Sequence, residues 1–104
     1  MQIITVTELK AWMDEGKDFQ LIDVREGFEA EIAAIGGLLI PVSQVAARID
    51  EIATDKPVVV HCRSGARSAN VIAALEAKGF ANLSNLQGGI IAWSNEIDAT
   101  VPKY

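Results

Sequence analysis

The sequence contains few thiol and imidazole groups: Cys62 is its only cysteine and His61 its only histidine among 104 residues. One cysteine cannot form a disulfide within the chain, and one cysteine with one histidine is too small a ligand set for a structural zinc site. No apolar run is long enough to span a bilayer, and the first residues do not resemble a signal peptide. We therefore expect a cytoplasmic protein without a metal or a membrane partner.

Positive charge is also scarce. Nine Lys and Arg residues against fourteen Asp and Glu residues give a formal net charge of -5, which disfavours nucleic-acid binding. Two of the nine basic residues, Arg63 and Arg67, nevertheless lie within five residues of Cys62. Half of the residues are hydrophobic, and this length predicts one domain over residues 1–104 with one core.

The cysteine lies in a loop between a predicted strand, Val58 to His61, and a helix-forming run from Ala69 to Lys78. Backbone N–H groups of such a loop, together with a helix N-terminus, form an electropositive cup that suits an anion. A thiol in that cup has a depressed pKa, and the two arginines add charge that does not titrate. The pattern predicts a cysteine nucleophile that acts on an anionic substrate.

Strands and helices alternate along the rest of the chain. Further strands are predicted at 3–5, 19–24, 38–40 and between 80 and 86, and further helices at 7–16, 28–34, 43–52 and 90–95. Thr7 and Ser43 are the predicted N-caps, and Gly88-Gly89 opens the last helix. The alternation predicts an α/β fold with a mostly parallel sheet and helices on both faces. Ligands of such sheets bind beyond the carboxyl ends of the strands, where Cys62 and the segment 23–25 are both expected.

Three motifs, at residues 21–26 (LIDVRE), 58–68 (VVVHCRSGARS) and 86–93 (LQGGIIAW), resemble the rhodanese family in order and spacing. The similarity runs from about Thr7 to Tyr104. It implies a single-domain sulfurtransferase with a central five-stranded parallel sheet and no metal or organic cofactor. By this resemblance Cys62 takes a sulfane sulfur from thiosulfate or a protein persulfide. It then passes that sulfur, as a persulfide, to a thiophilic acceptor such as cyanide, a thiol or a sulfur-carrier protein.

The resemblance also implies roles for the residues of the loop. Their backbone amides would cradle the persulfide, and Arg67, together with Arg63, would hold the anionic donor. The implied substrate-binding set is Arg63, Ser64, Gly65, Ala66, Arg67 and Ser68. The hydroxyls of Ser64 and Ser68 are candidate hydrogen-bond donors to the sulfur, and Ser68 is equally a candidate N-cap of the following helix.

Three further residues are predicted to support the site. Because strand side chains alternate, His61 is expected to point away from Cys62 and to be hydrogen-bonded beneath the loop as a structural residue rather than a base. Asp23 and Arg25 are expected to form hydrogen bonds and an ion pair that fix the neighbouring loops, with substrate contact as the alternative.

Two other segments bear on the sulfur acceptor. The tail from Ala92 to Tyr104 resembles the end of rhodanese domains fused to adenylyltransferases, which makes a ubiquitin-like sulfur-carrier protein and its adenylyltransferase candidate partners. The last residues of that tail are expected to be irregular. The segment 29–37 lacks the Tyr and the Gly-His-Ile-Pro-Gly sequence found in many members of the family, so acceptor specificity is left open.

Two alternative functions remain. Cysteine-dependent phosphatases and arsenate reductases also use a His-Cys loop with an arginine, but they place five residues between Cys and Arg. Here four residues separate Cys62 from Arg67, which makes a smaller cup, suited to a sulfur atom. The second alternative is a non-catalytic rhodanese-like binding module, against which the cysteine and the two loop arginines argue.

Overall fold

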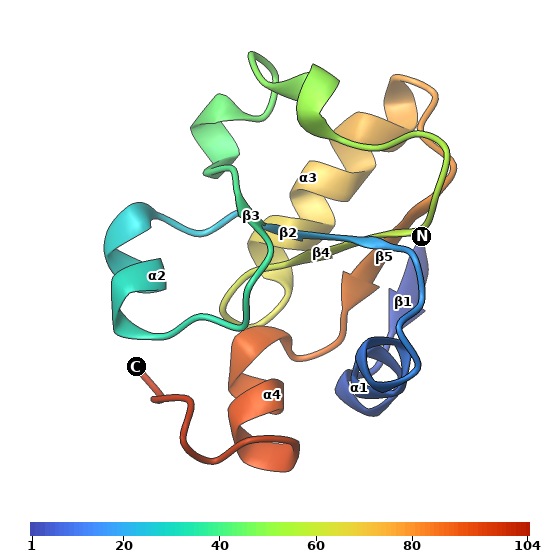
Figure 1. The fold of residues 1–104 in the computed structure, drawn as a ribbon. Coiled ribbons are helices and arrows are strands. Elements are labelled where there is room, and N and C mark those ends of the chain that lie inside the picture. The colour runs from blue at the N-terminus through green and yellow to red at the C-terminus, as the bar shows by residue number, and fades with distance from the viewer.

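The computed structural model describes all 104 residues. Its centre is a sheet of five strands in the order β1-β5-β4-β2-β3, and every neighbouring pair is parallel (Figure 1). The strands are β1 (Gln2–Ile4), β2 (Gln20–Asp23), β3 (Leu38–Leu39), β4 (Val58–His61) and β5 (Leu83–Leu86). The predicted α/β class with a five-stranded parallel sheet is therefore confirmed.

Three α-helices and two short 3-10 turns connect the strands, and a fourth α-helix follows the last strand. The helices are α1 (Val6–Asp14), α2 (Gly27–Ile32), α3 (Ala66–Ala77) and α4 (Gly89–Glu96), and the turns are η1 (Val42–Gln44) and η2 (Ile49–Glu51). Helices α1 and α4 lie on one side of the sheet and α3 on the other (Figure 1). A membrane crossing would need a longer and more apolar helix than any of these.

The central strand β4 divides its side chains between two cores. Val58 and Val60 pack with Ile72 and other residues beneath α3, whereas Val59 packs with Trp93 and other residues beneath α1 and α4. All three valines are at most 1% exposed. A strand that is covered on both faces carries apolar side chains at successive positions, as Val58, Val59 and Val60 do.

The first helix begins two residues earlier than predicted. Thr5, not Thr7, is its N-cap: the Thr5 hydroxyl accepts a hydrogen bond from the Glu8 N–H at 3.1 Å, and the Glu8 carboxylate accepts one from the Thr5 N–H at 3.1 Å. This reciprocal capping box starts the helix directly after β1. The shift also buries Val6, which is 2% exposed.

The helix predicted over 43–52 is wrong, because this segment forms only η1 and η2. Its apolar residues do face the core, but the backbone of Arg48 leaves the helical region at φ -113° and ψ 23°. The Arg48 side chain is drawn to the Leu39 carbonyl, 3.1 Å away, and to the Glu51 carboxylate. Ser43 therefore caps no α-helix.

The carboxyl ends of β2 and β4 lie side by side. Asp23 is paired in register with His61, and the Val24 N–H donates to the His61 carbonyl at 3.0 Å. The loop after β4 therefore emerges next to the segment that follows β2. This is the arrangement that the sequence predicted for Cys62 and residues 23–25.

Candidate active site

The loop after β4 turns tightly around the sulfur of Cys62. Gly65 takes φ +114°, which favours glycine, and serves as the N-cap of α3. Its N–H donates to the Cys62 Sγ at 3.1 Å, and the Ser68 Oγ lies 3.3 Å from the same sulfur. Ser68 lies inside the first turn of α3, so its predicted alternative role as N-cap is wrong, and its hydroxyl faces the sulfur instead.

Two opposing effects set the pKa of the Cys62 thiol. Burial raises it, because the thiolate loses hydration. Hydrogen bonds from the Ser68 hydroxyl and from the N–H groups of Ser68, Gly65 and Ser64 lower it and outweigh burial. The pKa of Cys62 therefore lies below its ordinary value, and the thiolate is favoured although the residue is 1% exposed. Ser64 acts through its backbone, and its own side chain is exposed.

Asn85 on β5 holds this arrangement from behind. Its Oδ1 lies 2.6 Å from the Ser68 Oγ, whose single proton can be directed to this oxygen or to the Cys62 sulfur, and its Nδ2 donates to the Gly65 carbonyl at 3.1 Å. Asn85 is 8% exposed, so these bonds replace water that the side chain has lost. The amide fixes both a sulfur-contacting hydroxyl and the turn that supplies the N–H group.

The first turn of α4 is hydrogen-bonded to the same loop. The N–H groups of Ile90 and Ile91 donate to the carbonyls of Cys62 and Arg63 at 3.0 and 3.2 Å. Gly89 makes this approach possible: it has φ +58°, and a Cβ at this position would lie only 2.5 Å from the Cys62 carbonyl oxygen. The glycine pair opens a helix, as predicted, and also brings it against the loop.

Arg67 points to a carboxylate rather than into open solvent. Its Nη1 and Nη2 donate to Glu29 of α2 at 2.7 and 2.8 Å. Hydrogen bonding to Arg67 lowers the pKa of Glu29 to about 2. Burial acts in the opposite direction and raises this pKa, whereas hydrogen bonds from the Glu26 N–H and the Tyr104 hydroxyl lower it further. The same pair raises the pKa of Arg67.

Arg63 is engaged by the end of the described chain. Its Nε donates to the Tyr104 backbone oxygen at 2.6 Å, its Nη2 contacts the same oxygen, and its guanidinium lies 5.2 Å from the centroid of the Tyr104 ring. The tail passes from α4 and ends beside α2 (Figure 1). It contains no helix or strand, as predicted, yet it is docked on the loop.

Asp23 and Arg25 form the ion pair that the sequence predicted. The Arg25 Nε and Nη2 donate to the two Asp23 carboxylate oxygens at 2.9 and 2.7 Å, and Nη2 also donates to the Ala33 carbonyl at 2.8 Å. Arg25 is fully buried and Asp23 is 3% exposed. The pair ties the end of β2 to the end of α2, and neither side chain is open to a substrate.

His61 is buried as expected, but the predicted hydrogen bond is absent. Neither ring nitrogen has a hydrogen-bond partner in the protein, and Nε2 lies 3.9 Å from the Asp23 Oδ2. Both oxygens of Asp23 accept hydrogen bonds from Arg25, and in this position the carboxylate is too far from Nε2 to accept one from His61. Burial lowers the pKa of His61, so the ring is neutral near pH 7.

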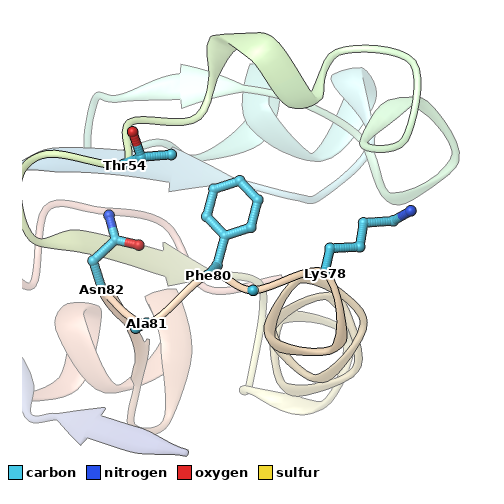
Figure 2. A pocket seen from close by; sticks show the side chains of 6 residues that line it. Thr54, Lys78, Phe80, Ala81 and Asn82 are labelled. Carbon is cyan, nitrogen blue, oxygen red and sulfur yellow. The ribbon is translucent and has the colours of Figure 1, made fainter.

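The cavities of the structure lie away from Cys62. Figure 2 shows one of about 310 Å³, lined by Thr54, Lys78, Gly79, Phe80, Ala81 and Asn82. Asn82 precedes β5, so this cavity is at the amino ends of the strands, opposite the loop. It contains no cysteine, histidine or carboxylate. Cys62 lines none of the four cavities.

Three residues that contact the segment Cys62 to Ser68 were not predicted from the sequence: Glu29, Asn85 and Tyr104. For Glu29, a signal was available in the Glu26-to-Glu29 spacing at a predicted helix start, which forms a capping box. For Asn85, the signal was a polar residue in a strand of a parallel sheet, where a buried side chain needs hydrogen-bond partners. The tail gave no comparable signal for Tyr104.

In comparison with known protein families, residues 5–96 match the model of the rhodanese-like domain. A sulfurtransferase of Allochromatium vinosum is 40% identical over 79 residues, which cover 75% of this chain and 74% of that protein. The crystal structure of a rhodanese-like domain protein from Staphylococcus aureus has a TM-score of 0.84 and 34% identity, and covers 93% of this chain and 95% of that one.

A longer relative is the probable adenylyltransferase/sulfurtransferase MoeZ of Mycobacterium tuberculosis. It is 38% identical over 104 residues, which cover 97% of this chain. The chain spans only 26% of the length of that protein.

Proposed function

The chain belongs to the family of rhodanese-like domains, and from this we propose that it is a sulfurtransferase that carries sulfane sulfur on Cys62 as a persulfide. Its relatives named sulfurtransferase support the transferase class. The observation that carries the proposal is the sulfur environment: the Gly65 N–H at 3.1 Å and the Ser68 hydroxyl at 3.3 Å favour a thiolate at Cys62. Such a thiolate is the required nucleophile.

In the first step the Cys62 thiolate attacks the outer sulfur of the donor. With thiosulfate, a new S–S bond forms at Cys62, the S–S bond of thiosulfate breaks, and sulfite leaves with the bonding electron pair. With a protein persulfide, the donor cysteine leaves as a thiolate. Neither reaction needs a general base, which fits the neutral and inaccessible ring of His61.

In the second step the acceptor attacks the outer sulfur of the Cys62 persulfide. With cyanide, a C–S bond forms, the S–S bond breaks, and thiocyanate leaves as the Cys62 thiolate is restored. The terminal sulfur of the persulfide is an anion for which the loop N–H groups of Ser64, Gly65 and Ser68 are suitable donors. Arg63 and Arg67 are the proposed ligands of an anionic donor.

For the acceptor in the cell we propose a ubiquitin-like sulfur-carrier protein that an adenylyltransferase has activated. The support is the 38% identity with the protein named MoeZ, whose name joins adenylyltransferase and sulfurtransferase. Because Cys62 is a free thiol, we also propose that the protein works in a reducing compartment, the cytoplasm. Failure of the persulfidated protein to pass sulfur to such a carrier and adenylyltransferase would contradict the acceptor assignment.

The phosphatase alternative has less support. A cysteine phosphatase needs a protonated group to give a proton to its leaving group. The carboxylate nearest to the loop arginines is Glu29, and its pKa of about 2 leaves it deprotonated near pH 7. Its two oxygens are occupied by Arg67.

Thiocyanate formation from thiosulfate and cyanide tests the proposed activity, with Cys62→Ser as the matched control. We expect turnover by the wild type, none by Cys62→Ser, and no release of nitrophenol from para-nitrophenyl phosphate by either protein. Cys62-dependent phosphate release without thiocyanate would contradict the proposal and favour the phosphatase. Absence of both activities, including with a persulfide donor, would favour a binding module.

A further inference from the structure

Both arginines of the loop already have partners within the chain. Arg67 is bound by the Glu29 carboxylate at 2.7 and 2.8 Å, and Arg63 donates to the backbone oxygen of Tyr104 at 2.6 Å. Cys62, which precedes them, is 1% exposed. An anionic sulfur donor that approaches this conformation therefore finds the Nε and Nη2 of Arg63 and the Nη1 and Nη2 of Arg67 already engaged within the chain.

Tyr104 is connected to both arginines. It holds Arg63 directly, and its hydroxyl donates to the Glu29 Oε1 at 2.9 Å, the same oxygen that accepts from Arg67. The hydroxyl also accepts from the Arg25 Nη1 at 3.0 Å, so it is anchored to a fully buried group. One residue thus joins the end of β2, α2 and the loop.

The tail is attached at two points with exposed chain around them. The Val101 carbonyl accepts from the Ser94 hydroxyl of α4 at 2.6 Å, and Tyr104 docks on the loop. Between these points Pro102 and Lys103 are exposed. Because Pro102 and Lys103 are exposed, release of Tyr104 would free Arg63 without disturbing the sheet or its two cores.

We propose, on the basis of the sulfur transfer proposed above, that Tyr104 is a specificity-determining residue that limits how well the site accepts small anionic donors. When Tyr104 is docked, Arg63 is turned to the tail and Glu29 is held against Arg67. When it is undocked, the N–H donors of Arg63 become available to an oxyanion next to Cys62. The identity of residue 104 therefore tunes the affinity for an anion, and the thiolate itself is unchanged.

The charge selectivity of Cys62 alkylation tests this directly and needs no sulfur transfer. The same thiolate attacks the CH2 carbon of iodoacetate and of iodoacetamide, with iodide as the leaving group. The two reagents differ in charge, so the ratio of their rates is independent of the pKa of Cys62. We expect Tyr104→Ala to raise the ratio of iodoacetate to iodoacetamide rates by about fivefold, with a smaller rise in Tyr104→Phe. Asn95→Ala, an exposed neutral change on α4, should leave the ratio unchanged.

A double variant identifies the arginine responsible. In Tyr104→Ala/Arg63→Ala the rise should disappear, because the freed guanidinium is gone. A ratio that does not rise in either Tyr104 variant, or that rises equally in the double variant, would overturn the proposal. Circular dichroism establishes whether each variant is folded. If Tyr104→Ala does not fold, the test is made with Tyr104→Phe, which keeps the aromatic ring.

Turnover gives a second readout. We expect Tyr104→Ala to lower the KM for thiosulfate with little change in kcat or in the KM for cyanide, since only the anionic donor uses Arg63. An unchanged or higher KM for thiosulfate would contradict the role of Tyr104. If the wild type transfers no sulfur at all, the proposed function fails, whereas the alkylation ratio still decides the role of Tyr104.

Discussion

Arg67 and Glu29 form a two-bond ion pair between the start of α3, directly after the Cys62 loop, and α2, with Nη1–Oε2 and Nη2–Oε1 distances of 2.7 and 2.8 Å. The Glu29 side chain is 7% exposed and the Arg67 side chain 39% exposed, so the carboxylate side of the pair is enclosed. The pair fixes the direction of the arginine proposed to bind the sulfur donor. It also makes the stability of the protein depend on pH.

Glu29→Gln tests this dependence. The pKa of Glu29 falls from an ordinary 4.5 to about 2 on folding. Its contribution to stability is therefore fully present above about pH 4.5 and is lost as the pH falls toward about 2. Urea titrations should show a lower free energy of unfolding for Glu29→Gln at pH 7 and a smaller difference from the wild type in acid. Glu31→Gln, an exposed change on the same helix, is the control, and an equal effect of both would contradict the assignment.

Ser68→Ala should raise the pKa of Cys62, because the hydroxyl 3.3 Å from the sulfur favours the thiolate. The rate of iodoacetamide alkylation against pH measures this pKa. The midpoint should move to higher pH in Ser68→Ala. It should stay unchanged in Ser64→Ala, which keeps its N–H group and loses only an exposed hydroxyl. Identical midpoints in the two variants would show that the Ser68 hydroxyl does not act on the sulfur.

Gly89→Ala should both destabilise the protein and slow transfer. The new Cβ would meet the carbonyl oxygens of Arg63 and Cys62 at 2.4 and 2.5 Å, so α4 and the loop must separate. We expect a loss of more than about 2 kcal/mol in urea unfolding. Gly16→Ala is the matched control, since Gly16 also has a positive φ but has open space around its Cβ position, and it should cost only about 1 kcal/mol. Equal costs would exclude the close approach at Gly89.

Arg25→Ala should be among the most destabilising single changes, because it leaves the buried Asp23 carboxylate without its partner. A loss of about 3–5 kcal/mol is expected from a broken buried pair. Lys10→Ala removes one member of the exposed pair Lys10–Asp14 and should change stability by less than about 1 kcal/mol. Chemical unfolding of both variants measures the difference, and a loss at Arg25 as small as that at Lys10 would mean that water replaces the pair.

What could be predicted from the sequence was mostly local. The strand, loop and helix around Cys62 are contiguous, and the alternation of strands and helices fixes the parallel sheet. The differences from the structure are also local. The spacing of a capping box lies at Thr5 and Glu8 rather than at Thr7, and the helical spacing of Val45, Ile49 and Ile52 does not guarantee a helix.

The residues that surround the loop could not be predicted, because their contacts are distant in sequence. Asn85 meets Ser68 across 17 residues, Glu29 meets Arg67 across 38, and Tyr104 meets Glu29 across 75. Neither hydrophobic periodicity nor a short motif in a single sequence indicates which distant residues form such contacts. His61 shows the same limit, because alternation along the strand predicts that its ring points away from Cys62 but does not reveal that both ring nitrogens lack a hydrogen-bond partner.

The central claim, a persulfide on Cys62, is tested most directly by the intact mass of the protein after incubation with thiosulfate. We expect one added sulfur atom on the wild type, none on Cys62→Ser, and its loss on addition of cyanide with the appearance of thiocyanate. A protein that gains no sulfur from thiosulfate or from the persulfide of a cysteine desulfurase, or that gains it equally in Cys62→Ser, would contradict the account.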